Sequence, residues 1–272
     1  MGDQALKLES RRDLYVLYEA FSEDDDEEGN PIFLFSSFGY MTDDHVAYFG
    51  QSKLRKYDLT PKDIIESLEL VPDEDIYPQA PNGITITTTP IDSTIFFKGP
   101  KLNTSFLGTN LLQELLLQEA NTLELLKRNP HANIVGYHGC VIKRGRIVGF
   151  VLDRLPMTLE ERLRNSPEKI DIEACMRKIV SAVDHLHSLG LAHNDLTPHN
   201  IMVDKSDSPV LIDFGSCGPF GATLITAGTP GWIDEDYVVS GPQFDRVALV
   251  KIRAWLERGG TNDNSGTEYP FR

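Results

Sequence analysis

The fold of this chain is decided by the sequence LAHNDLTPHNIMV at residues 191–203, followed by VLIDFG at residues 210–215. Asp195 and Asn200 lie on one short loop, and Asp213 ends the next apolar strand. Carboxylate and carboxamide oxygens are the ligands that Mg²⁺ prefers. A carboxylate that is free of metal can accept a proton from a hydroxyl group. The stretch therefore predicts a site that holds divalent metal and phosphate beside a general base.

This stretch resembles the protein kinase family, whose catalytic loop has the pattern H-R-D-L-x-x-x-N and is followed by D-F-G. The matching residues are His193, Asp195, Leu196, Asn200, Asp213, Phe214 and Gly215. The resemblance implies an α+β, two-lobed fold, with an antiparallel-sheet small lobe at residues 71–155 and a mainly helical, shortened large lobe at residues 156–272. It also implies ATP and Mg²⁺ as cofactors, Asp195 as the catalytic base, and Asn200 and Asp213 as metal ligands.

The composition limits the partners and the compartment. The chain has 272 residues, 40% of them hydrophobic, and a formal net charge of −15. An acidic surface repels nucleic acid and anionic membranes, so we expect neither as a partner. The three cysteines form no C-x-x-C pair and suit a reducing compartment. With a polar N-terminus and no apolar run long enough to cross a membrane, we expect an intracellular and cytoplasmic protein.

Residues 1–70 form an N-terminal, β-rich extension for which the sequence suggests no chemistry. Short strands are predicted between residues 13 and 52, and the acidic run at residues 23–30 ends in turn residues. We interpret this run as a solvated hairpin tip, because it lacks the pattern of a calcium loop. Thr60 and Pro61 are typical of the cap and first position of a helix, which is predicted to end at Leu70.

Residues 71–100 contain two predicted strands, at residues 84–87 and 93–98. By the resemblance, Lys98 at the end of the second strand contacts the α- and β-phosphates of ATP. The Leu-rich helix predicted over residues 105–127 then supplies a glutamate that pairs with Lys98. Glu114, Glu119 and Glu124 compete for this role. We choose Glu119, because leucines follow it at positions 123 and 126 and the HANIV motif begins at residue 131.

A strand pair with a turn at residues 143–145 is predicted to complete the small lobe. By the resemblance, Leu152 is the gatekeeper, and the backbone of Asp153 to Leu155 is the hinge that meets adenine. Helices are predicted over residues 157–164, 171–188 and 245–258. The resemblance makes Asp245 the acid that braces the catalytic loop, and it places the segment around Thr229 near the peptide-substrate site.

The chain departs from the family at four points. No G-x-G-x-x-G motif precedes Lys98, so a backbone cradle for the phosphates is not identified. Asn194 replaces an arginine that pairs with phosphorylated activation loops, and Thr197 replaces a lysine that neutralises the transferred phosphate. Strand alternation also places Phe96 on the face of Lys98, where the family has a small alanine against adenine.

Three functions are therefore open. The first is an ATP- and Mg²⁺-dependent kinase that phosphorylates Ser or Thr hydroxyls of a protein. The second is a pseudokinase, catalytically weak or dead, that acts as a binding or scaffold module for a protein partner. The third is a small-molecule kinase of the aminoglycoside or choline kinase type. Retention of the charged catalytic residues favours the first function, whereas Phe96, Thr197 and the missing glycine motif favour the second. The Phe214-Gly215 pair and the segment around Thr229 argue against the third.

Overall fold

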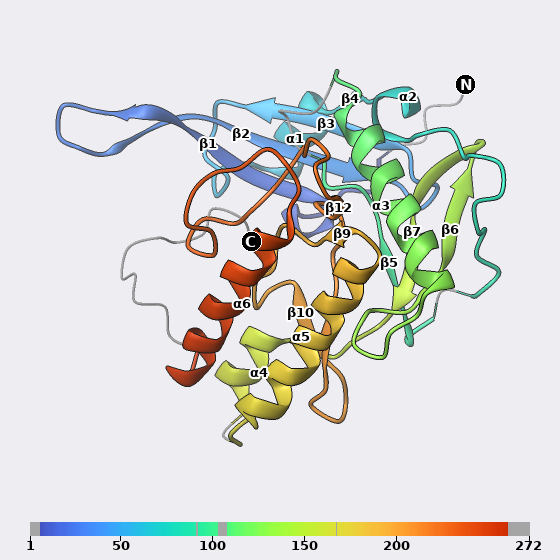
Figure 1. Cartoon of the computed structure of the whole chain (residues 1–272). Coiled ribbons are helices and arrows are strands. Elements are labelled where there is room, and N and C mark those ends of the chain that lie inside the picture. The colour runs from blue at the N-terminus through green and yellow to red at the C-terminus, as the bar shows by residue number, and fades with distance from the viewer. Residues whose placement is uncertain (1–5, 91, 103–107, 167, 261–272) are drawn as a thin grey trace.

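The computed structural model of the chain describes residues 6–90, 92–102, 108–166 and 168–260. Two antiparallel sheets of four and three strands occupy the N-terminal half, and three helices with two small sheets of short strands follow (Figure 1). The predicted α+β class is therefore confirmed. No helix in the described part of the chain is long and apolar enough to cross a membrane.

The N-terminal sheet has the strand order β1-β2-β3-β4. Its strands are β1 (Val16–Asp25), β2 (Pro31–Met41), β3 (Ala47–Ser52) and β4 (Glu69–Leu70). The acidic run is the tip of the β1–β2 hairpin, as predicted, and the Asp26 amide donates to the carbonyl oxygen of Asn30. Helix α1 (Pro61–Ser67) begins with a reciprocal capping box of Thr60 and Asp63, but it ends three residues before the predicted Leu70. A short 3₁₀ helix, η1 (Arg11–Asp13), precedes the sheet.

The N-terminal sheet packs against the segment that leads into β5 (Ile95–Lys98). The Tyr77 hydroxyl, next to helix α2 (Asp73–Ile76), donates to the carbonyl oxygen of His45 at 3.0 Å. The His45 ring in turn lies 4.8 Å from the ring of Phe97 on β5. Ala47 of β3 is buried in the main hydrophobic core. Residues 16–52 and β5 therefore share one packed interface.

The second sheet has the order β5-β7-β6, with β6 at Tyr137–Lys143 and β7 at Arg146–Asp153. The strand predicted at residues 84–87 is wrong, because this segment makes only an isolated bridge between Ile86 and Cys140 of β6. Gly139 makes that approach possible: a Cβ atom there would lie 2.6 Å from the Thr87 nitrogen. In the described part of the chain, no strand pairs with the outer edge of β5.

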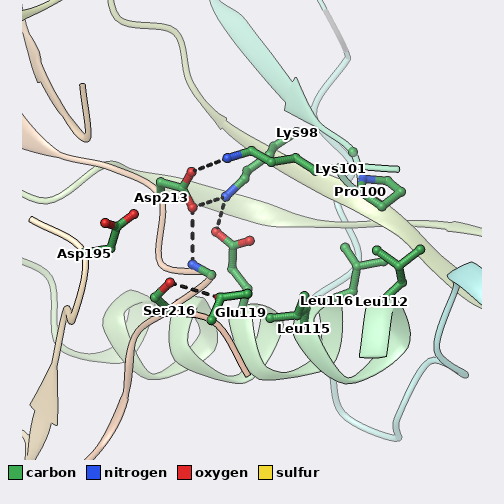
Figure 2. Close-up of a pocket in the computed structure, with 13 residues that line it drawn as sticks. Lys98, Pro100, Lys101, Leu112, Leu115, Leu116, Glu119, Asp195, Asp213 and Ser216 are labelled. Carbon is green, nitrogen blue, oxygen red and sulfur yellow. Dashed lines mark hydrogen bonds and ion pairs between the residues drawn. The ribbon is translucent and has the colours of Figure 1, made fainter. Parts of the chain in front are cut away.

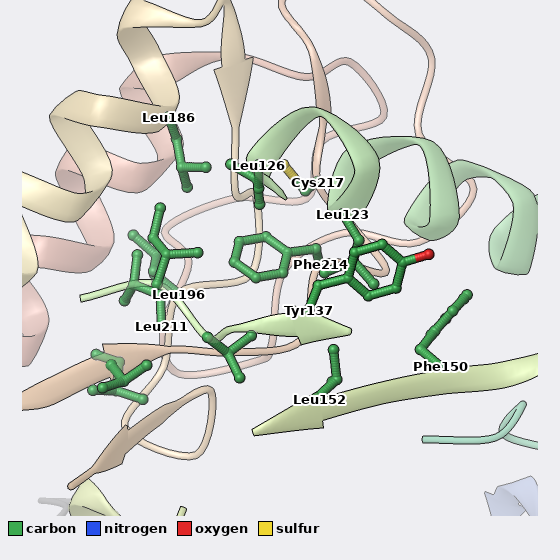
Figure 3. Packing of buried hydrophobic residues seen from close by; sticks show 14 of the residues in the cluster. Leu123, Leu126, Tyr137, Phe150, Leu152, Leu186, Leu196, Leu211, Phe214 and Cys217 are labelled. Carbon is green, nitrogen blue, oxygen red and sulfur yellow. The ribbon is translucent and has the colours of Figure 1, made fainter. Parts of the chain in front are cut away.

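Helix α3 (Leu111–Arg128) crosses the face of this sheet. The predicted start of the helix, at residues 105–107, lies outside the described residues. Leu123 and Leu126 are buried against Tyr137 of β6 and against residues of the C-terminal half, including Phe214 (Figure 3). This single core holds α3, and the acidic residue Glu119 on it, in place relative to both halves of the chain.

The C-terminal half contains the predicted helices, which gather on one side of the molecule (Figure 1). Helix α4 (Leu159–Asn165) is capped by Thr158, α5 (Ile172–Ser188) by Asp171, and α6 (Pro242–Glu257) begins three residues before the predicted Asp245. Short strands connect them: β8 (Met157–Thr158), β9 (Leu191–Ala192), β10 (Ile201–Val203), β11 (Pro209–Leu211) and β12 (Gly218–Pro219).

Candidate active site

The loop between β9 and β10 is anchored by a buried carboxylate on α6. Asp245 is fully buried, and its two oxygens accept 2.8 Å hydrogen bonds from the backbone amides of His193 and Asn194. His187 lies 2.8 Å from the same carboxylate. A buried carboxylate requires such donors, because burial of an unpaired charge is costly. The contact holds the loop that carries Asp195 in one conformation.

Both carboxylate oxygens of Asp195 accept hydrogen bonds from side chains. The Thr229 hydroxyl donates to Oδ1 at 2.6 Å, and Nδ2 of Asn200 donates to Oδ2 at 2.9 Å. Because the Asn200 nitrogen points to Asp195, its carbonyl oxygen is turned away from that carboxylate. The backbone amide of Ile212 donates to the backbone carbonyl oxygen of Asn200 at 3.0 Å, which brings Asn200 beside the segment of Asp213.

Lys98 connects three elements of the fold at one point (Figure 2). Its Nζ atom lies 2.6 Å from Oε1 of Glu119 on α3 and 2.9 Å from Oδ1 of Asp213 after β11. The structure thereby selects Glu119 among the three candidate glutamates. Glu114 is exposed, and the carboxylate of Glu124 accepts from the Thr85 amide and the Tyr137 hydroxyl instead.

The charges of this group are set by burial and by mutual attraction. Burial opposes the charged form of Lys98, but Glu119 and Asp213 outweigh it and raise the pKa of the amine. Burial alone would raise the pKa of Asp213, yet Lys98 and Lys101 together hold it well below its usual range. Burial raises the pKa of Glu119 against the opposing effect of Lys98. Lys98 and Asp213 are therefore charged at neutral pH.

Asp213 has a backbone conformation that non-glycine residues rarely adopt. Its φ of 60° lies in the left-handed region, where Asp is tolerated better than most residues. The next residue, Phe214, is fully buried in the hydrophobic core (Figure 3). Its ring lies 5.4 Å from that of His193. The Phe214 amide also donates to Oε1 of Glu119 at 3.1 Å. These contacts stabilise the turn that directs the Asp213 carboxylate toward Lys98.

A pocket of about 240 Å³ opens beside this group. Lys98, Glu119, Asp195 and Asp213 all line it, together with leucines of α3 (Figure 2). The sequence analysis missed one further charged residue of this lining, Lys101, whose Nζ lies 3.1 Å from Oδ2 of Asp213. A second lysine three positions after Lys98 was the available signal, but nothing local shows that its side chain returns to the site.

Comparison with known proteins agrees with this geometry. Residues 107–241 match the model of the protein kinase domain family. This part of the chain belongs to the protein kinase family. Lys98 precedes the matched residues, so its assignment rests on its contacts with Glu119 and Asp213.

The relatives are distant and cover part of the chain. A leaf rust 10 disease-resistance locus receptor-like protein kinase-like 1.1 of Arabidopsis thaliana is 30% identical over 135 residues, which are 45% of this chain and 22% of that protein. The serine/threonine-protein kinase/endoribonuclease IRE1 of Hypocrea jecorina is 33% identical over 129 residues, which are 40% of this chain and 10% of that protein. The serine/threonine-protein kinase Sgk1-B of Xenopus laevis is 32% identical over 139 residues, which are 48% of this chain and 31% of that protein. The chain thus spans less than a third of the length of these curated relatives.

The two substitutions in the kinase catalytic loop are both structural here. Thr197 is 1% exposed, and its hydroxyl accepts from the amides of His199 (3.2 Å) and Asn200 (3.3 Å), so it shapes the loop. Asn194, with a φ of 61°, donates from Nδ2 to the carbonyl oxygens of Ala192 and Ser216 and to the Ser240 hydroxyl. Asn194 therefore links the loop to the segments before and after it.

The residues expected to meet adenine lie apart from the pocket described above. Leu152 is buried at the end of β7, whereas the Asp153 carboxylate is partly exposed and lies 2.7 Å from Nε2 of His138. Phe96 is 45% exposed, and the Arg154 guanidinium lies 5.8 Å from the centre of its ring. Neither Asp153 nor Leu155 lines the pocket. Their role in binding adenine stays a prediction.

The donor set for a metal consists of oxygen atoms. In the described part of the chain, no group of three or more His, Cys, Asp or Glu side chains could hold a metal ion. Mg²⁺ is commonly held by one or two protein carboxylates together with phosphate oxygens and water. The Asp213 carboxylate and the side-chain oxygen of Asn200 fit that mode, and they do not fit an all-protein site.

Proposed function

We propose that this chain binds a magnesium nucleoside triphosphate, ATP in the first instance, and transfers its γ-phosphoryl group to a Ser or Thr hydroxyl of a protein. The observation that carries the proposal is the position of Lys98. Its ammonium group bridges Glu119 and Asp213, so that residues from three different segments of the chain meet at one point. A buried cation fixed between two carboxylates, beside Asp195, suits a reaction in which positioning and electrostatic stabilisation do most of the work.

In this proposal each charged residue has one role. Asp195 accepts the proton of the acceptor hydroxyl as its oxygen bonds to the γ-phosphorus, and the bond from that phosphorus to the bridging oxygen breaks to leave the nucleoside diphosphate. Lys98, held by Glu119, binds the phosphates that remain with the nucleotide. Asn200 and Asp213 hold Mg²⁺, which when bound neutralises phosphate charge. The 2.6 Å bond from Thr229 orients the Asp195 carboxylate toward the acceptor.

The proposal includes a division of the chain into three parts. Residues 71–155 form a small lobe around the β5-β7-β6 sheet, and residues 156–272 are assigned to a large lobe whose described part, residues 156–166 and 168–260, is mainly helical. The pocket then lies between the lobes, since its lining comes from β5 and α3 on one side and from Asp195 and Asp213 on the other. Residues 1–70 form an extension that packs against the small lobe. The backbone of Asp153 to Leu155 is the hinge between the two lobes.

A second candidate function, a pseudokinase that binds a protein partner, is favoured by specific observations. Thr197 is buried within its loop and places no cation in the pocket. No described strand pairs with the outer edge of β5, where a hairpin would cover the phosphates. Phe96 lies half exposed on the face of β5 that carries Lys98. These features weaken phosphate and adenine binding while leaving the fold intact.

Thermal unfolding of the full chain with and without Mg-ATP tests nucleotide binding. A ligand at 100 times its dissociation constant stabilises a protein by about 2.7 kcal/mol, so the unfolding temperature should rise by a measurable amount. Asp213→Ala should reduce the rise, because a metal ligand is lost. Asp184→Asn, an exposed carboxylate on α5, is the matched control and should leave the rise unchanged. No stabilisation at millimolar nucleotide would contradict the proposal.

Transfer is measured separately, with γ-labelled ATP and a mixture of acceptor proteins. The wild type should label protein, and Asp195→Asn should abolish labelling while it preserves thermal stabilisation by Mg-ATP. The asparagine keeps the size of the side chain but cannot act as the base. Nucleotide binding without labelling in the wild type would select the pseudokinase instead.

A further inference from the structure

Lys101 lies between two buried residues, but its own side chain is exposed. Its neighbours in the chain, Pro100 and Leu102, are both buried, which fixes the position of its Cα atom. Its own side chain is 85% exposed, but Nζ lies 3.1 Å from Oδ2 of Asp213. The four-carbon stem of a lysine can swing its ammonium over several ångströms while the backbone stays in place. The pocket therefore has a cation at its rim that can change partners.

Both oxygens of Asp213 face an ammonium group. Lys98 lies 2.9 Å from Oδ1, and Lys101 lies 3.1 Å from Oδ2. A divalent cation that binds this carboxylate repels both ammonium groups, so at least one of them must move away. Lys98 has only 16% of its side chain exposed and is also held by Glu119. Lys101 is the residue that is free to move.

Two lysines supply the positive charge that the described lining of the pocket offers to a transferred phosphoryl group. Lys98 and Lys101 are the cationic side chains in the described lining of the pocket. The Thr197 hydroxyl accepts hydrogen bonds within its own loop, and in the described part of the chain no strand beyond β5 offers backbone amides. With Lys98 engaged by Glu119, a further cation near the terminal phosphate has to come from Lys101.

We propose that Lys101 is a phosphate-binding residue, whose ammonium group leaves Asp213 for the terminal phosphate of a bound magnesium nucleoside triphosphate. This assignment rests on the proposed function and extends it. It names Lys101 as the source of the positive charge that a lysine at position 197 would supply to the transferred phosphate. A cation placed where negative charge is carried during transfer stabilises the transition state. Lys101 is thus both a partner of Asp213 in the free chain and a contact of the nucleotide in the complex.

Calorimetric titration of the full chain tests this assignment with Mn²⁺ or Mg²⁺ alone, Mg-ADP, Mg-ATP and adenosine. Lys101→Gln should lower the affinity for Mg-ATP about tenfold, as expected for one charge-assisted hydrogen bond. It should lower the affinity for Mg-ADP less and leave adenosine unchanged. Affinity for the metal alone should rise, because Asp213 loses a competing cation. Lys101→Arg should restore most of the Mg-ATP affinity.

Lys62→Gln is the matched control, since it removes one charge from an exposed lysine of α1 that pairs with Glu66. It should change none of the affinities. If Lys101→Gln raises the affinity for both metal and Mg-ATP, Lys101 only shields Asp213 and the proposal is overturned. Unchanged affinities for both ligands would overturn it equally.

The binding titrations separate this proposal from the proposed function. If the wild type binds Mg-ATP but labels no protein, the proposed phosphoryl transfer is contradicted. The Mg-ATP affinities of the Lys101 variants then still test whether Lys101 binds phosphate. If the wild type labels protein and Lys101→Gln changes neither Mg-ATP affinity nor labelling, the kinase function stands and the role of Lys101 is wrong. A wild type that binds no nucleotide contradicts both proposals.

Discussion

The Oδ1 atom of Asp245, on α6, accepts a 2.8 Å hydrogen bond from the backbone amide of Asn194, fifty-one positions earlier in the chain. The other carboxylate oxygen binds the next amide toward the N-terminus, that of His193. One buried carboxylate thus satisfies two amides of the loop that carries Asp195. Helix α6 holds the candidate catalytic loop in place by this contact.

Asp245→Asn should destabilise the chain by about 2–3 kcal/mol, measured by urea unfolding. The asparagine has one acceptor oxygen, so its NH₂ group faces one of the two amides and leaves a buried donor unsatisfied. Asp236→Asn, which changes an exposed carboxylate a few residues earlier, should be neutral. Equal stabilities of the two variants would show that the contact does not hold the loop.

Asn194 combines a left-handed backbone with four side-chain hydrogen bonds, and two substitutions separate these contributions. Asn194→Gly keeps the backbone relaxed but loses the hydrogen bonds, whereas Asn194→Ala loses the hydrogen bonds and strains the backbone. The alanine variant should be less stable than the glycine variant by about 1 kcal/mol, because a Cβ atom disfavours a φ of 61°. Chemical unfolding of the three proteins measures the order. Equal stability of the alanine and glycine variants would mean that the loop relaxes to another conformation.

The ion pair of Asp207 with Arg162 should make the free energy of unfolding depend on pH. Nε and Nη2 of the buried Arg162 donate to the two oxygens of Asp207, at 2.7 and 2.6 Å, and this contact lowers the pKa of the carboxyl group. A carboxyl group whose pKa is lower in the folded chain than in the unfolded chain stabilises the fold. This stabilisation is complete above the pKa of the unfolded chain, about 3.9, and is lost as the pH falls through the pKa of the folded chain.

Asp207→Asn should therefore cost about 1 kcal/mol at pH 7, a value that allows for the partial exposure of the carboxylate. The difference from the wild type should shrink as the pH falls below about 4. Asparagine also tolerates the left-handed φ of 57° at this position, so the backbone is not strained. Urea unfolding at a series of pH values measures the effect, with Asp184→Asn as the control. A difference that is constant with pH would exclude the ion pair as its cause.

Phe96→Ala should tighten the binding of Mg-ATP by about three- to tenfold, because the half-exposed ring lies on the face of β5 that carries Lys98. Phe21→Ala is a matched control. Phe21 is also half exposed, and an arginine, Arg55, lies 5.4 Å from the centre of its ring, but it belongs to the N-terminal sheet. Calorimetric titration compares the two variants. Unchanged affinity in Phe96→Ala would show that the ring does not obstruct the nucleotide.

Local patterns predicted the helices better than the strands. Thr60, Thr158 and Asp171 cap α1, α4 and α5, and α5 and α6 lie within three residues of their predicted bounds. The error at residues 84–87 has a tertiary cause. An alternating pattern predicts a half-buried segment, but a glycine on β6 determines that this segment lies along β6 without forming a ladder.

The sequence by itself determined that residues 107–241 belong to the protein kinase family, and it gave the order of the charged residues, because the motifs of a catalytic loop and its helices depend on neighbours a few positions apart. Only the tertiary structure decided which glutamate meets Lys98, that Lys101 returns to Asp213, and that Thr197 faces into its own loop. Lys98 and Asp213 are 115 positions apart in the chain. Their contact depends on the packing of α3 against the β5-β7-β6 sheet and the C-terminal half, and no local pattern contains that information.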